Sequence, residues 1–183
     1  MAMHGAWARK LEAVHLGALG VWLGALVMVS ATAALAFPTM KGLQPALPGY
    51  RVDLMEHPQI AAGHMMNPVF MGVMVGGTAC AALALLAWRS MGWVRRALSV
   101  VLVLLAAGTL IGVGLAMQDH LHAYWEAARA GELEAAAGAK QRFDALHPWS
   151  SRALRAQAAL VLLALVVGAW SAGGTRTREE RAA

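Results

Sequence analysis

Histidine and tryptophan in the first apolar stretch are the residues whose types and spacing first suggest chemistry. His15 is the one ionisable residue between Ala13 and Phe37. An ionisable group within such a stretch is unfavourable unless it meets water or a partner, so His15 needs a functional or structural reason. Imidazole ligates haem iron, copper and zinc, and it relays protons. Trp22 follows two helical turns later on the same face, so His15 and Trp22 form a candidate cofactor site, with haem b as one candidate.

A second group of candidates lies near the opposite ends of the apolar stretches. Imidazole and carboxylate ligate zinc and copper, and a helical fold would bring these residues to one rim. The predicted metal ligands are His64, Asp119, His120, His122 and His147. Against this, histidines are common at a membrane interface, and an i,i+2 spacing does not place both rings of His120 and His122 on one helix face. The metal site and the interfacial interpretation both stay open.

Two further patterns bear on a site. One helical face of the second apolar stretch carries polar and thioether side chains at spacings of three and four, which predicts a soft, partly polar stripe facing a cavity. The stripe is His64, Asn67, Met71, Met74 and Thr78. At the other end, Glu12 and His15 are neighbours on one face, and Arg95 and Arg96 begin the third stretch at the same depth. An ion pair of Glu12 with one of these arginines, and a hydrogen-bonded His15 beside it, is the structural explanation of His15.

Composition places the chain in a membrane. It has 183 residues, of which 59% are hydrophobic and 14% charged, whereas soluble domains carry about 25% charge. The net charge of +5 is typical of cytoplasmic anchoring residues. Basic runs interleaved with stacking aromatics are missing, so nucleic acid is not an expected partner. The single cysteine, Cys80, cannot form an internal disulfide and leaves the compartment open.

Four apolar segments predict the fold. They cover about residues 12–37, 65–88, 97–118 and 153–171. Each is long enough to cross a hydrocarbon core of about 30 Å as a helix, and no series of short alternating strands indicates a barrel. The expected class is all-α: an integral membrane four-helix bundle forming a single transmembrane domain over 1–183. The first segment exceeds the length of a signal-peptide core, which predicts that it is retained.

The connections are predicted as follows. Residues 123–146 are alanine-rich with spaced charges and indicate a short helical excursion between spans three and four, broken near Gly131 or Gly138. Ser150 or Ser151 is a candidate cap for the last helix. Lysines and arginines precede span one, separate spans two and three, and follow span four. The positive-inside rule then predicts an inner (plasma) membrane protein with both termini cytoplasmic.

Two resemblances accompany these patterns. The first span and the approach to the last resemble the family of small four-span membrane proteins typified by human transmembrane protein two hundred and five. The residues that carry the resemblance are Trp22-x-Gly24, Phe37-Pro38 and Arg142-Phe143-x-x-Leu146-His147-x-x-Ser150-Ser151. That family has no assigned reaction. The core His15-x6-Trp22-x-Gly24 is also similar to the first spans of copper-resistance D membrane proteins and of the four-helix protoporphyrinogen oxidase, and the latter likeness implies a haem-linked His15.

Three functional hypotheses follow. The first is a non-enzymatic protein whose outer-face histidines bind, or help move, a metal ion or small ligand. The second is a haem-dependent membrane oxidoreductase that uses His15. The third is a structural subunit, or a homo-oligomer, that packs through Gly17, Gly20 and Gly24 in span one. The lipid bilayer is the expected partner in all three.

Overall fold

Each apolar segment forms the middle of a long helix in the computed structural model. The structure describes the backbone of residues 2–180 and the side chains of residue 7, residues 9–88 and residues 91–171. Met1 and residues 181–183 of the predicted domain lie outside the described part. The helices are α1 (Ala2–Leu43), α2 (His57–Ala84), the 3-10 helix η1 (Leu85–Ser90), α3 (Trp93–Thr109), the π-helix η2 (Leu110–Gly114), α4 (Leu115–Ala130) and α5 (Leu133–Glu180).

The helices form long rods, because α2 continues into η1 and α3 continues through η2 into α4. Among the described residues, four such rods are long and apolar enough to cross a membrane. They cover Arg9–Leu43, His57–Trp88, Trp93–Ala130 and Leu133–Ser171. About 20 helical residues span a hydrocarbon core, so α1 with 42 residues and α5 with 48 are roughly twice the length needed. The all-α class and the presence of four candidate spans are confirmed.

The helix ends differ from the prediction. The expected segment 153–171 is the apolar part of a helix that begins at Leu133, because its alanine-rich polar start is also a good helix former. The expected cap at Ser150 or Ser151 is therefore wrong: both lie inside α5, and Ser150 is buried. The break at Gly131 is confirmed, with φ of 80° ending α4 in the left-handed conformation that glycine adopts at low cost.

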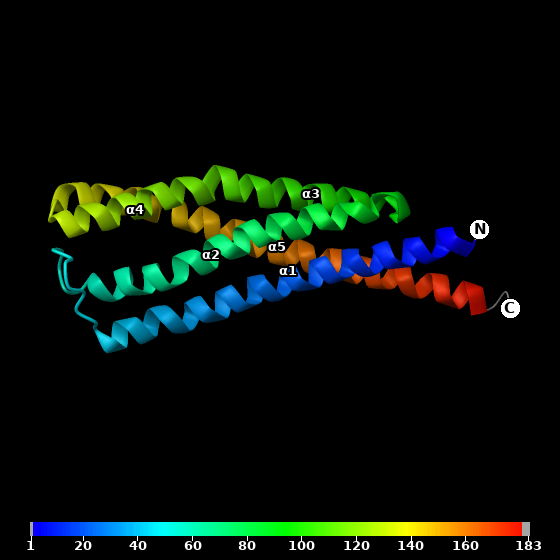
Figure 1. Ribbon diagram of the computed structural model, residues 1–183, viewed down its shortest axis with the longest axis horizontal. Helices are drawn as coiled ribbons and strands as arrows, with labels where there is room; N and C mark the ends of the chain where they lie inside the picture. Colours follow the sequence, from blue (N-terminus) through cyan, green and yellow to red (C-terminus); the bar gives the residue numbers. More distant parts are fainter. Residues whose placement is uncertain (1, 181–183) are drawn as a thin grey trace.

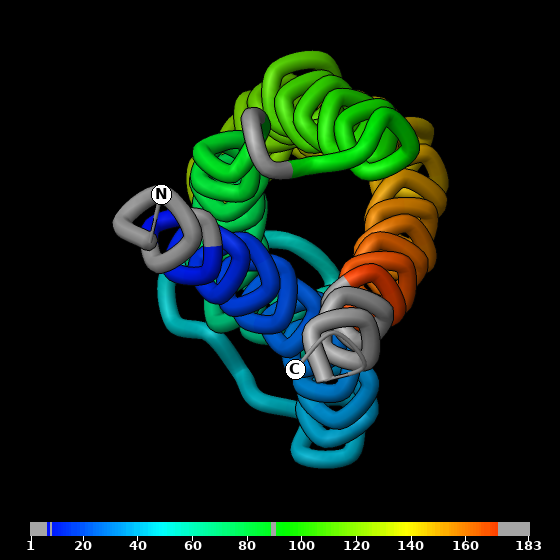
Figure 2. Tube along the Cα trace, turned by 90° about the vertical axis from the view of Figure 1, so that its right-hand side faces the viewer, coloured from blue at the N-terminus to red at the C-terminus, as the bar shows by residue number. Residues whose placement is uncertain are grey.

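The rods run side by side and antiparallel, as Figure 1 shows. The start of α1, the end of α5 and the turn between α2 and α3 lie at one end, called the terminal end here. The segment 44–56 and the turn at Gly131 lie at the other, the loop end. Seen along the rods, α1 and the α3–α4 rod each lie between α2 and α5 (Figure 2).

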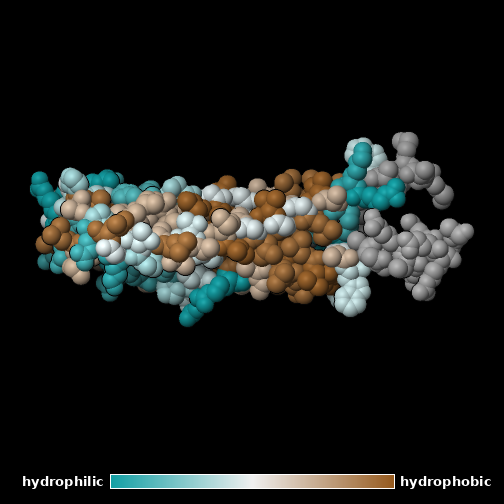
Figure 3. Space-filling model, turned by 90° about the horizontal axis from the view of Figure 1, so that it is seen from below, coloured by the Kyte–Doolittle hydropathy of each residue, from teal (hydrophilic) through white to brown (hydrophobic). Residues whose placement is uncertain are grey.

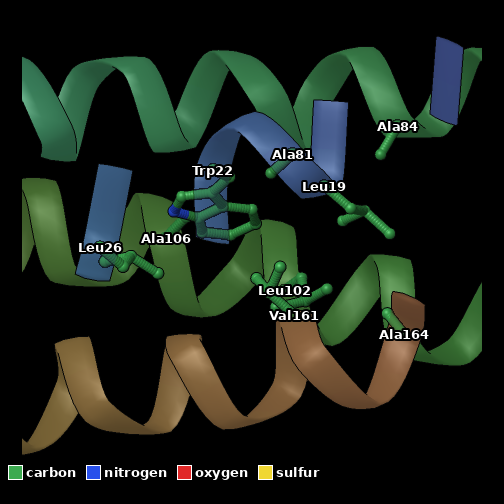
Figure 4. Close-up of a cluster of buried hydrophobic side chains, with 9 residues drawn as sticks. All are labelled: Leu19, Trp22, Leu26, Ala81, Ala84, Leu102, Ala106, Val161 and Ala164. Carbon is green, nitrogen blue, oxygen red and sulfur yellow. The ribbon is translucent and has the colours of Figure 1, made fainter. Parts of the chain in front are cut away.

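The main core lies in the terminal half. Trp22, Leu19 and Leu26 of α1 meet small residues of α2 and side chains of α3 and α5 (Figure 4). A second core, around Tyr124 and Trp125, joins α4 to the start of α2 and of α5 at the loop end. The two halves of the molecule therefore have separate packing centres.

Every rod is irregular in its loop-end half or at its middle. Pro38 lies inside α1, Pro68 inside α2 and Pro148 inside α5. The α3–α4 rod carries the π-helical turn Leu110–Gly114. Proline removes a backbone hydrogen bond and a π turn inserts a residue, so both bend a helix.

The hydropathy of the surface also differs between the two halves of the molecule. Figure 3 shows a hydrophobic band from the middle of the rods toward the terminal end, with hydrophilic side chains toward the loop end and again at the terminal end on the face in view. Many large apolar side chains on that part of the rods are exposed, among them Val21, Leu104 and Leu162. Exposed apolar surface of this extent is typical of a face that meets lipid or another protein.

Candidate functional site

A chamber of about 690 Å³ opens between α1, α2, α4 and α5. Its lining residues come from 26–37, 59–74, 114–125 and 140–158, which places it in the loop-end half of the molecule. Small-molecule sites have volumes of roughly 300–1,000 Å³. Each helix irregularity lies at a lining residue: Phe37, Asn67 and His147 line the chamber and directly precede Pro38, Pro68 and Pro148, and Gly114 of the π turn also lines it.

The floor and walls of the chamber are mostly apolar. Leu26 and Val29 come from α1, Met74 from α2 and Leu154 from α5. Met74 packs directly over Gly114 of the π turn, where an added Cβ would lie 2.7 Å from its Sδ atom. The absence of a side chain at Gly114 thus lets Met74 fill the position beside the chamber.

The soft stripe expected on the second span is partly confirmed. Asn67, Met71 and Met74 line the chamber, and the amide nitrogen of Asn67 donates to Oε1 of Gln118 at 3.0 Å, joining α2 to α4. Two stripe members do not line it. His64 is turned to the loop end, and the Thr78 hydroxyl donates to the carbonyl of Met74 within its own helix.

One face of α5 supplies the polar rim. Lys140 pairs with Asp144 at 2.9 Å, and His147 stacks on Phe143 with ring centroids 5.7 Å apart. Arg155 donates from Nε to the carbonyl oxygen of Ser151 at 3.1 Å. These residues recur at spacings of three and four, so they form one stripe along the chamber.

Two of the predicted metal ligands lie around one tryptophan. The His64 ring stacks on Trp125 at 3.7 Å, and His122 lies 5.6 Å from the same indole. Nε2 of His64 is engaged by the Tyr50 hydroxyl at 2.5 Å. Trp125 is 6% exposed and is buried among these rings. His64 therefore contributes to holding segment 44–56 against α2 and α4.

Other contacts attach the same segment. The backbone N–H of Leu47 donates to Nδ1 of His57 at 2.8 Å, and that of Arg51 donates to the carbonyl of Ala128 at 2.8 Å. The Tyr124 hydroxyl donates to Glu56 at 2.5 Å. Polar contacts of His57, His64, Tyr50 and Tyr124 thus stabilise the loop-end core.

The remaining predicted ligands are spread out. Asp119 is exposed, His120 is half-buried, and His147 lies on the chamber rim. Across residues whose placement is described, no three histidine, cysteine, aspartate or glutamate side chains group as a metal site would require. The copper or zinc hypothesis gains no support from this arrangement and stays a prediction.

The predicted cofactor pair lies in the packed terminal half. His15 and Trp22 are each 1% exposed. Nδ1 of His15 donates to the carbonyl oxygen of Ala84 at 3.0 Å, and the Trp22 indole lies against Gly77, in the space a Cβ would need. A carbonyl on Nδ1 is what a metal-bound histidine uses and also what a buried histidine needs. Haem binding at His15 stays a prediction.

An ion pair of Glu12 with Arg95 or Arg96 was predicted, and the pair with Arg95 is confirmed. Arg95 lies 2.8 Å from Glu12, and the two side chains are 7% and 22% exposed. This pair fixes the start of α3 against α1, next to His15. It accounts for Glu12 and Arg95 by structure alone.

Sequence reasoning found Asn67, Met71, Met74 and His147 but missed most of the other residues that line the chamber. Met66, Met117 and Arg155 line it, but only the spacing of Lys140, Asp144, His147, Ser151 and Arg155 along one helix face was a usable signal. That signal was hidden because α5 was expected to begin after His147.

Comparisons of the chain with protein-family models, curated proteins and solved structures found no match. The resemblances to the small four-span family, to copper-resistance D proteins and to the haem-binding oxidase therefore stay predictions.

Proposed function

We propose that this protein is a non-enzymatic multi-pass membrane protein that binds a small, largely apolar molecule in the chamber. The observation that carries the proposal is the chamber itself: about 690 Å³, apolar in its depth and polar along α5. Concave, mostly apolar sites with a few placed polar groups are the usual form of a small-molecule site.

The proposal includes an orientation in the inner (plasma) membrane. Arg9, Lys10, Arg95 and Arg96 lie at the terminal end, and the positive-inside rule makes that end cytoplasmic. A hydrocarbon layer placed over the exposed apolar surface of the terminal half then leaves the chamber in the outer half of the four-helix bundle. Its polar rim would lie at the outer membrane surface, where an amphipathic molecule can enter from the lipid.

A second candidate function is packing against another membrane subunit or a second copy. Gly17, Gly20 and Gly24 are exposed on α1, and an added Cβ at any of them would meet open space. Small residues on an exposed span favour close helix contact in lipid. Crosslinking in native membranes separates this function from ligand binding, because it reports a neighbour and not an adduct.

Binding in the chamber is tested by introducing a large side chain that fills part of it. Ala33 of α1 lines the chamber, whereas its neighbour Ala34 is exposed on the outside of the same helix. We expect Ala33→Phe to reduce binding of hexadecanol, measured by native mass spectrometry, about tenfold, and Ala34→Phe to leave it unchanged. Equal binding by wild type and both variants would refute the chamber as the site.

A further inference from the structure

The rim of the chamber carries an unbalanced positive charge. Lys140 and Asp144 neutralise each other as an ion pair, and the neighbouring His147 is engaged in a ring stack. Arg155 also lines the chamber. Within the described chain, the ion pairs are Arg95–Glu12 and Lys140–Asp144, so Arg155 has no carboxylate partner there.

The position of Arg155 suits the head of an amphiphile. Its Nε donates back to the carbonyl of Ser151, one turn toward the loop end, so the side chain extends along the rim in that direction. The remaining guanidinium nitrogens provide donors for a charged oxygen, and arginine is well matched to carboxylate and phosphate.

The walls that α1 and α2 give to the chamber are mostly apolar. Leu26, Val29 and Phe37 line it from α1, and Met66, Phe70 and Met74 line it from α2. A hydrocarbon tail placed there removes apolar surface from water, which is favourable at roughly 25 cal/mol per Å². A cation on the α5 wall and apolar side chains on the α1 and α2 walls are complementary to a molecule with an anionic head and an alkyl tail.

We propose that the chamber binds a single-chain amphiphile with a carboxylate head, such as a long-chain fatty acid from the outer leaflet, and that Arg155 binds the carboxylate. This inference rests on the proposed function and adds the class of ligand. Arg155 is a binding residue, and the Lys140–Asp144 pair lies farther toward the loop end on the same helix.

The test compares three amphiphiles with one tail: hexadecanoate, hexadecanol and hexadecylammonium. Native mass spectrometry of the purified full chain at pH 8 measures the bound fraction of each. We expect hexadecanoate to bind about tenfold more tightly than hexadecanol, because a charged hydrogen bond exceeds a neutral one by about that factor. Hexadecylammonium should bind most weakly.

Variants of two arginines separate the effect of the charge at Arg155 from the effect of removing any positive charge from α5. Arg155→Gln should reduce hexadecanoate binding to the level of hexadecanol, and Arg155→Lys should restore part of the difference. Arg152→Gln is the matched control, since Arg152 is on the same helix but lies over Trp149, 5.1 Å from its ring centroid. Hexadecanol binding by Arg155→Gln verifies that the variant is folded.

The outcomes distinguish the two proposals. If the three heads bind equally, or if Arg155→Gln and Arg152→Gln have the same effect, the anionic ligand class is refuted and the chamber remains. If the wild-type protein binds none of the three, the proposed function fails together with this inference.

Discussion

At the residue scale, two histidines of α2 attach the segment 44–56 to the helices. His57 and His64 hold segment 44–56 through Leu47 and Tyr50. In His64, Nε2 is committed to Tyr50 and the ring face is covered by Trp125, which leaves little of the imidazole for a ligand. These contacts explain His64 by structure.

The Glu12–Arg95 pair is the residue-scale feature with the clearest energetic consequence. We expect Glu12→Ala to lower the free energy of unfolding by about 3–5 kcal/mol, because it leaves a buried guanidinium without its counter-charge. Nε and Nη2 of Arg95 already lack hydrogen-bond partners within the described chain, so the remaining protein cannot compensate.

Stability in detergent, followed by circular dichroism during SDS titration, measures this loss. Asp144→Ala is the matched control, since it breaks an exposed i,i+4 pair worth about 0.3–0.5 kcal/mol. Similar losses in the two variants would show that Glu12 does not stabilise Arg95.

At the element scale, the chamber depends on interrupted helices. Pro148 lies inside α5 between His147 and Ser150, both of which line the chamber. Pro148→Ala restores an N–H that can donate to the carbonyl of Asp144, so α5 should straighten toward the other helices. We expect hexadecanol to bind several-fold more weakly as a result.

The control for this prediction is Pro58→Ala. Pro58 is in the first turn of α2, where no intrahelical hydrogen bond is lost to proline, so its replacement should leave binding unchanged. Unaltered binding by Pro148→Ala would mean that the bend of α5 does not shape the chamber.

Helices were predictable from sequence in their apolar parts and not at their polar ends. Hydropathy identified all four spans because lipid requires long uninterrupted apolar segments. It placed the start of the last helix near 153, whereas α5 begins at Leu133, because an alanine-rich segment in water carries little hydropathy signal. The stripe of Asn67, Met71 and Met74 was found by helical periodicity alone.

The size and position of the chamber could not be predicted from the sequence, for a physical reason. It results from the divergence of rods that are far apart in the chain, and periodicity within one helix does not report the distance to another. The Tyr50–His64 contact likewise joins a loop to a helix through side chains that have no common periodicity. Glu12–Arg95 was predictable because both ends of the pair lie beside segment boundaries at one depth.

At the scale of the whole molecule, the proposed orientation can be tested by labelling. Met55 in segment 44–56 is 72% exposed and Trp93 at the terminal end is 80% exposed. In a background with Cys80→Ser, we expect a membrane-impermeant maleimide to label Met55→Cys in intact cells. Trp93→Cys should react only after lysis, because the basic residues near it favour the cytoplasmic side.

The opposite labelling pattern would place the termini outside and the chamber in the inner half of the membrane. Labelling of both positions in intact cells would contradict a transmembrane arrangement of the rods. Either result would leave the chamber geometry unchanged but would alter which leaflet supplies its ligand.

The continuity of α5 has a mechanical consequence. From Ser150 on the chamber to Ser171 near the terminal end the helix contains no proline and no irregular turn, a distance of about 33 Å at 1.5 Å per residue. A stiff lever of this length tilts as one piece. Filling or emptying the chamber would therefore also move the part of α5 at the terminal end, because no loop separates the two.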